Sequence, residues 1–173
     1  MSSKRLGRKK LIEIAKFIVI FNVLAIPMYV VLNYNLSFDP FRNFIAFLSA
    51  KFLSVFGIDA VQTNSFIDIL ASNQLLKIDI SFDSTGWKTL YALVALVLAT
   101  PARKPKDKMR FLAIGLPVLF ALNLLRIATT ILVAVVFGFQ YFEVVHIFLW
   151  REGLIAAVVL IWYLWLRQKK IIY

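Results

Sequence analysis

The chain has 173 residues, of which 61% are hydrophobic, and a formal net charge of +11. It is too apolar for a soluble domain of this length and long enough for several membrane spans. It has no cysteine and a single histidine, which excludes disulfides, thiolate chemistry and metal sites built from thiolates or several histidines. We therefore expect no metal and no other cofactor.

Basic residues gather in three clusters that flank the apolar runs. Five lie between residues 4 and 10, five between 103 and 110, and three between 167 and 170. This placement is the positive-inside pattern of membrane proteins and differs from the basic face of a nucleic-acid-binding domain. We expect membrane lipid, and no nucleic acid, among the partners.

The hydropathy pattern predicts four spans, at about residues 11–33, 87–101, 111–137 and 145–166. The first contains Pro27, which a membrane helix tolerates, and it is too long for a signal-peptide core, so it is expected to be a retained anchor. The second is short, reaching about 20 Å. Four spans put both termini and every basic cluster in the cytoplasm, so residues 34–86 are expected outside.

Two elements are predicted between the first and second spans. Phenylalanine and aliphatic residues recur at helical spacing from Phe41 to Phe56, which predicts an amphipathic helix on the membrane surface that ends at Gly57. From Phe66 to Phe82 short apolar alternation predicts a small β-hairpin with Asn73 at its turn. The predicted fold is an all-α integral membrane bundle with this insert, and residues 1–173 form a single domain.

Aromatic residues are predicted to mark the inner end of the fourth span. Trp162, Tyr163 and Trp165 lie close to its last residues. Tryptophan and tyrosine are enriched where a helix meets the membrane surface. The three residues are therefore expected to form an interfacial belt.

The segment Asp83-Ser84-Thr85-Gly86 leads into the second span. One interpretation is a helix N-cap, because Asp, Ser and Thr satisfy free amides there. The other is a reactive site, because a hydroxyl beside a helix N-terminus lies where a developing anion is stabilised. The two interpretations are compatible.

Polar residues also occur inside the third span. Asn123, Arg126 and Thr130 share one helix face, and an ionisable residue within a membrane is a functional candidate by default. The alternative is a structural network that joins helices. If the span is straight to Phe137, Arg126 lies about 16 Å below its outer end.

The start of the fourth span supplies the remaining candidates. His146 is the only histidine, and its ordinary pKa suits general base catalysis, although a lone interfacial histidine is usually incidental. Arg151 and Glu152 follow; as neighbours on a helix they face different directions. Each then needs a partner elsewhere, and Glu152 with Arg126 is one candidate pair.

The order of these motifs resembles that of the exosortase/archaeosortase family of membrane protein-sorting enzymes. The matching stretches are STGWK at 84–88, the basic loop 101–110, NLLRI at 123–127 and His146 in VVHIFLW. The resemblance covers about residues 78–166. It implies cleavage near the C-terminus of exported proteins, whose sorting signals combine a short motif, a hydrophobic helix and a basic tail, followed by transfer of the acyl group to an acceptor.

The resemblance also implies roles for individual residues. Ser84 takes the position of the family's nucleophilic cysteine, Arg126 stabilises the oxyanion or orients the carbonyl, and His146 acts as base and then acid. Asn123, Gly86, Thr130, Arg151 and Glu152 are supporting residues, and the site faces outward.

The serine at position 84 departs from the family pattern and leaves three explanations open: a natural serine nucleophile, an inactive family member, or an engineered Cys→Ser substitution. The alternative function is a non-catalytic membrane scaffold or substrate-binding protein. A transporter fits less well, because four spans show no inverted pair of broken helices.

Overall fold

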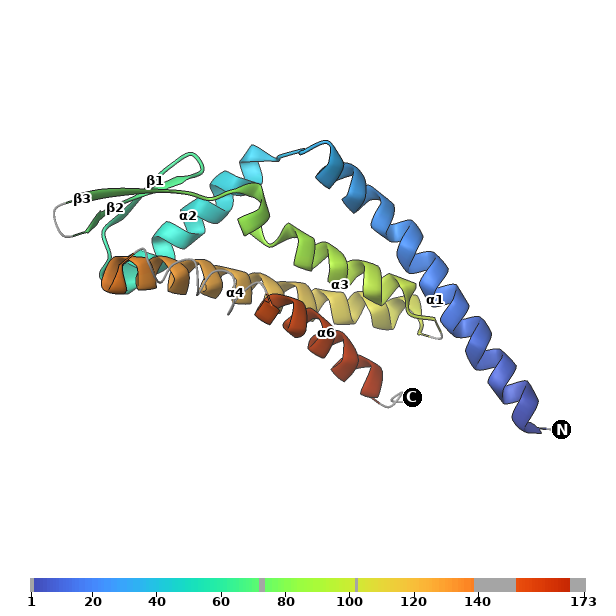
Figure 1. Ribbon diagram of the computed structural model, residues 1–173. Helices are drawn as coiled ribbons and strands as arrows, with labels where there is room; N and C mark the ends of the chain where they lie inside the picture. Colours follow the sequence, from blue (N-terminus) through green and yellow to red (C-terminus); the bar gives the residue numbers. More distant parts are fainter. Residues whose placement is uncertain (1, 72–73, 102, 139–151, 169–173) are drawn as a thin grey trace.

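The computed structural model of the chain describes residues 2–71, 74–101, 103–138 and 152–168. Four of the described helices run side by side: α1 (Ser2–Asn33), α3 (Trp87–Ala99), α4 (Pro105–Phe137) and α6 (Glu152–Arg167). The start of α1, the connection from α3 to α4 and the end of α6 lie at one end of the molecule (Figure 1). Helix α2 (Asp39–Val55) and a small sheet lie at the other end.

Two stretches of the described residues are long and apolar enough to cross a membrane, Gly7–Asn33 and Pro105–Phe137. Helix α3 is apolar but has 13 residues. Apolar side chains are exposed along α1, on one side of α4 and along α6, among them Leu11, Val19, Ile114, Val118 and Leu160. Exposed apolar surface of this extent indicates contact with lipid or with another protein.

The helices differ in length from the predicted spans. Helix α4 begins at Pro105, where proline fits because the first N–H groups of a helix have no internal partner. Helix α3 ends at Ala99, because Thr100 precedes Pro101 and takes an extended conformation. The start of the fourth predicted span lies outside the described residues, so the four-span arrangement remains a prediction.

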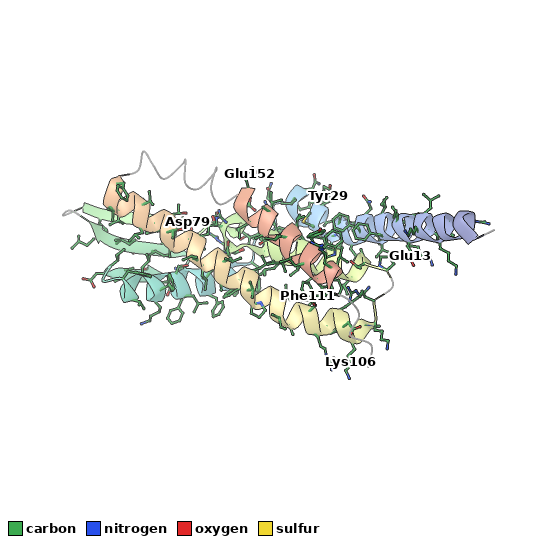
Figure 2. The ribbon with its side chains drawn as sticks, turned by 90° about the horizontal axis from the view of Figure 1, so that it is seen from below. Glu13, Tyr29, Asp79, Lys106, Phe111 and Glu152 are labelled. Atoms are coloured by element: carbon green, nitrogen blue, oxygen red, sulfur yellow. The ribbon has the colours of Figure 1, made fainter. Side chains whose placement is uncertain are left out.

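Side chains tie the helices together at the end that carries the α3–α4 connection. Nη2 of Arg103 donates to the backbone carbonyls of Trp165, Leu166 and Gln168, at 2.9–3.0 Å. Carbonyls at a helix C-terminus lack internal partners and carry partial negative charge, which favours a cation there. Lys106 also lies at this end, whereas Asp79 lies toward the other (Figure 2).

The three aromatic residues of the predicted belt differ in how far they are buried. Trp165 is 4% exposed and stacks on Phe111 with ring centroids 4.7 Å apart. Nε1 of Trp162 donates to Oγ1 of Thr100 at 3.0 Å, and its ring stacks on Phe17 of α1. Tyr163 is 47% exposed. Neighbouring helices bury the ring of Trp165 and partly cover that of Trp162, and the interfacial position of the three residues remains a prediction.

Helix α2 confirms the amphipathic helix predicted before Gly57, which has a φ of +76°. Its buried face, which includes Ile45 and Leu53, packs against the sheet and against Ile127 and Ile131 of α4. Phe44 and Phe47 remain exposed. The buried face of α2 therefore packs within the protein, and the location of the helix on the membrane surface remains a prediction.

The sheet has three antiparallel strands in the order β1 (Ala60–Thr63), β2 (Phe66–Ala71) and β3 (Gln74–Asp79). Strands β2 and β3 form the predicted hairpin, with Phe66 opposite Asp79. Its turn, including Asn73, lies outside the described residues. Strand β1 was not predicted; it is four residues long and lies at the sheet edge. Strand β3 continues directly toward α3, so the sheet fixes the chain just before Ser84.

Candidate functional site

The turn between β3 and α3 carries Ser84. Residues Phe82–Thr85 form a 3₁₀ helix, η1, with Ser81 as its N-cap: the Ser81 hydroxyl accepts from the Ser84 N–H at 3.2 Å. The predicted N-cap of α3 was therefore wrong. Gly86, which has no side chain to offer, precedes α3 instead, because Asp83, Ser84 and Thr85 are already folded into the preceding turn.

A second hydrogen bond joins the side chains of the two serines. Oγ of Ser81 and Oγ of Ser84 are 2.9 Å apart. Asp83 is directed to another partner, Nζ of Lys88, at 2.8 Å, and is largely exposed. Ser81 was missed in the sequence; its only signal there is its position three residues before Ser84, the spacing of a capping serine.

Gly86 packs directly against α4. Its φ is +79°, a conformation that L side chains rarely adopt. A Cβ placed on Gly86 would lie 2.6 Å from Cγ of Asn123. Gly86 therefore serves both the turn and the close approach of the η1 turn to α4.

The polar stripe of α4 is buried where this approach occurs. Asn123, Arg126 and Thr130 are 2%, 8% and 3% exposed. Nδ2 of Asn123 donates to the Ser84 carbonyl at 3.2 Å, and Oδ1 of Asn123 accepts from Nη1 of Arg126 at 3.3 Å. Thr130 donates to the Arg126 carbonyl within the helix at 2.8 Å. The predicted shared face is confirmed.

Ser84 and Arg126 line the same small cavity. It has a volume of about 40 Å³, and Thr130, Asp79 and Ile80 also contribute to its wall. A cavity of this size has room for water or for one small polar group. The helix face of Arg126 and the turn of Ser84 are distant in sequence, and the fold brings them together.

Asp79 and its partners were missed in the sequence. Oδ1 of Asp79 accepts from Nη2 of Arg42 at 2.9 Å and from the Ser65 hydroxyl at 2.8 Å. Nε of Arg42 also donates to the Ile80 carbonyl at 3.0 Å. Arg42 of α2 thus holds the end of β3 next to Ser81. The one sequence signal for Asp79 was its place as a carboxylate at the end of the strand that leads into the Ser84 segment.

Helix α4 is much longer than α3, and this difference determines what surrounds Arg126. Arg126 lies about 30 Å along α4 from Pro105, which is close to the thickness of a hydrocarbon core. Beyond this point α4 packs on α2 and the sheet. Helix α4 does run to Phe137, so Arg126 lies about 16 Å along the helix from that end. The η1 turn meets α4 at Asn123, one turn from Arg126.

Three predicted residues are left without a described place in the site. His146 and Arg151 lie outside the described residues. Glu152 begins α6 and is exposed, and its pairing with Arg126 remains a prediction. Among the described residues, no three His, Cys, Asp or Glu side chains gather into a group that could hold a metal ion.

Residues 5–166 match the protein-family model described as transmembrane exosortase. The chain belongs to this family. No curated protein and no solved structure gives a significant match. The match extends the resemblance seen at residues 78–166 to the first helix and the insert.

The chain is thus a membrane protein of a family that processes sorting signals, and exported proteins are the substrates of that family. In this context the buried Asn123–Arg126 pair beside Ser84 is a polar site at the end of an apolar bundle. Arginine donors near a hydroxyl suit chemistry in which negative charge develops on an oxygen.

Proposed function

We propose that the chain is a membrane peptidase or transpeptidase that cleaves C-terminal sorting signals of exported proteins, with Ser84 in the nucleophile's position. The observation that carries the proposal is that Ser84 and Arg126 line one cavity. The buried Asn123 side chain bonds to both residues and so fixes their relative positions.

In the first half-reaction, Oγ of Ser84 attacks the scissile carbonyl carbon and a general base takes its proton. Arg126 stabilises the oxyanion of the tetrahedral intermediate. The C–N bond then breaks, the proton passes to the departing amine, and an acyl-enzyme ester remains. The family resemblance assigns the base and acid steps to His146.

In the second half-reaction, the acyl group leaves Ser84. An acceptor amine attacks the ester carbonyl, the C–O bond to Ser84 breaks, and Ser84 recovers a proton. If the acceptor is an amine, the product is a new amide. If water takes the place of the amine, the product is a carboxylate. Neither half-reaction requires a metal or another cofactor.

The arrangement in the membrane follows from the charges. We place the basic end that contains Lys106 and both termini in the cytoplasm, and the sheet, α2 and the η1 turn on the outer side. Four spans, with Ser84 at their outer mouth, then let the site meet exported proteins.

The serine itself favours a second candidate function, a non-catalytic member that binds sorting signals. The Ser84 hydroxyl is already paired with the Ser81 hydroxyl at 2.9 Å. A serine must also lose its proton during attack, whereas a nearby cation can hold a cysteine as thiolate.

The test is co-expression of an epitope-tagged reporter that ends in a short motif, an apolar helix and a basic tail taken from an exported protein of the source genome. Ser84→Cys is expected to raise cleavage by well over tenfold, a barrier change of about 1.4 kcal/mol or more. Ser84→Ala provides the baseline, and gel mobility of the reporter provides the readout.

Each outcome has a distinct meaning. Equal, robust cleavage by the serine form and the Ser84→Cys form would identify a true serine enzyme. Absence of cleavage by both, with each protein folded in the membrane, would contradict catalysis and support the binding function.

A further inference from the structure

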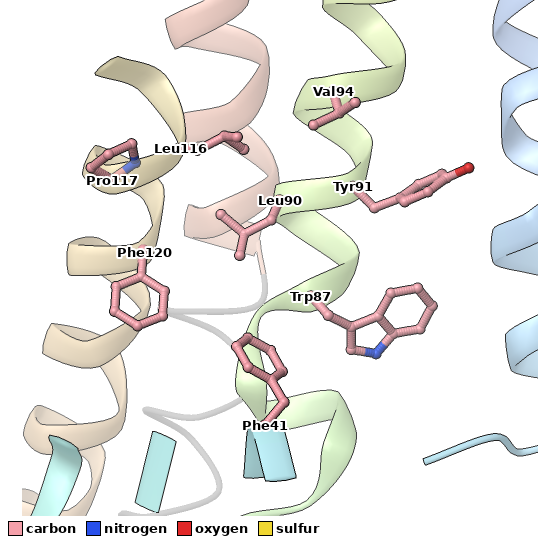
Figure 3. Close-up of a pocket in the computed structure, with 8 residues that line it drawn as sticks. All are labelled: Phe41, Trp87, Leu90, Tyr91, Val94, Leu116, Pro117 and Phe120. Atoms are coloured by element: carbon pink, nitrogen blue, oxygen red, sulfur yellow. The ribbon is translucent and has the colours of Figure 1, made fainter. Parts of the chain in front are cut away.

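Helices α3 and α4 pack side by side and leave a groove on each side of the pair. Helix α6 fills one groove, where Val158 and Trp165 meet Leu93 and Leu119 in an apolar cluster. The opposite groove has a volume of about 620 Å³. None of the described segments fills it, and it opens between the two helices (Figure 3).

The groove is lined by apolar surface along its length. Its walls include Leu90 and Val94 from α3 and Leu116 and Phe120 from α4, and Phe41 at the start of α2 stands at one end. A lining of this kind offers no hydrogen bonds. A suitable occupant therefore has an apolar outer surface and satisfies its own backbone, as a membrane helix does.

The groove leads to the candidate site. Trp87, another wall residue, is separated from Ser84 only by Thr85 and Gly86. The Trp87 ring stacks on Phe82 of the η1 turn, with centroids 5.2 Å apart. Val94 lies about 10 Å further along α3. An occupant of the groove would therefore end beside the η1 turn.

We infer that this groove receives the apolar helix of the sorting signal; the inference rests on the proposed function. Helix α6 shows that the α3–α4 pair accepts an apolar helix on its other side. A substrate helix lying parallel to α3 has its N-terminal end at the η1 turn. The short motif that precedes the helix then reaches Ser84, and the basic tail emerges at the end that carries Lys106.

The first test is photo-crosslinking to the tagged reporter in membranes, with a photoreactive amino acid at Val94. The matched control position is Val118, an exposed valine of α4 that does not line the groove. A crosslink at Val94 that is at least tenfold stronger than at Val118 is expected. Equal crosslinking at the two positions, or a Val94 product with lipid and none with the reporter, overturns the inference.

The second test fills the groove. Val94→Trp adds an indole ring inside it, whereas Val118→Trp adds the same ring on an exposed face. Val94→Trp is expected to lower reporter capture, measured by co-purification, at least tenfold, and Val118→Trp less than twofold. Full capture by a folded Val94→Trp variant contradicts the inference; a fluorescent fusion shows whether each variant is folded and monodisperse.

These readouts separate docking from catalysis. Crosslinking at Val94 without cleavage by the serine or the Ser84→Cys form supports the groove and contradicts the enzymatic proposal. Cleavage without crosslinking at Val94 supports the enzymatic proposal and contradicts the inference about the groove. If neither crosslinking nor cleavage is seen, both the inference about the groove and the enzymatic proposal are contradicted.

Discussion

The side-chain amide of Asn123 donates a hydrogen bond to the backbone carbonyl of Ser84 across 3.2 Å. The bond connects the middle of α4 to the turn before α3, 39 residues earlier in the chain. Because the same amide accepts from Arg126, the arginine and the serine turn have a fixed relative position. A site held by buried groups in this way is preorganised for stabilising a developing charge.

Arg126→Lys is expected to remove the gain in cleavage that Ser84→Cys produces. Lysine keeps the charge but lacks the planar fork that orients an oxygen and holds Asn123. Losing one such donor typically costs about 10²–10³ in rate. Reporter cleavage in the Ser84→Cys background measures the effect.

Arg103→Lys is the matched control, because Arg103 follows the end of α3 and bonds the end of α6, whereas Ser84 precedes the start of α3. Cleavage should be nearly unchanged in this variant. Equal loss in both variants would mean that stability, and not orientation of the carbonyl, explains the result.

Gly86→Ala is expected to lower both thermal stability and reporter cleavage. The positive φ alone costs about 1–2 kcal/mol for an L side chain. The new Cβ also overlaps Asn123, at 2.6 Å from its Cγ, and must push the η1 turn away from α4.

Gly57→Ala separates these two effects. Gly57 has a similar φ of +76°, and a Cβ there meets nothing within 4 Å. The melting temperature in detergent should fall less for Gly57→Ala than for Gly86→Ala, and cleavage should persist. Equal melting temperatures and equal cleavage would show that the Asn123 contact is unimportant.

Arg42→Ala should loosen the end of β3. Arg42 donates to Asp79, Ser65 and the Ile80 carbonyl, and hydrogen bonds to charged groups contribute about 1.5–3 kcal/mol each when buried. Because Asp79 is 45% exposed, we expect a smaller total destabilisation, of about 1–3 kcal/mol.

Thermal unfolding in detergent and protease sensitivity of the 60–80 segment measure this change. Lys51→Ala on the same helix, at an exposed position, is the control and should behave like the parent. A normal melting temperature for Arg42→Ala would show that the packing of α2 alone holds the sheet.

The topology prediction uses the absence of native cysteine. Single cysteines at Val61, which is 65% exposed, and at Lys106 should react differently with a membrane-impermeant reagent. Position 61 should be labelled in intact cells, and position 106 only after permeabilisation. Val61 avoids the nearby turn at Asn64, whose φ of +56° would strain a substituted residue. The reverse labelling pattern would invert the orientation and place Ser84 inside the cell.

The sequence by itself determined the features that depend on local pattern. Hydropathy and the basic clusters identified a membrane protein, and helical spacing predicted α2 and the shared face of Asn123, Arg126 and Thr130. Alternation predicted the β2–β3 hairpin. These patterns can be recognised in the sequence because side-chain direction repeats with a fixed period in a helix or strand.

Only the tertiary structure decided which distant residues meet. The Arg42–Asp79 pair and the contact of Gly86 with Asn123 join segments whose separation in sequence carries no periodic signal. The position of the site along α4 was also decided there: α4 is longer than α3, and its last turns pack on α2 and the sheet. Long-range packing, and not local propensity, therefore brought Ser84 and Arg126 to one cavity.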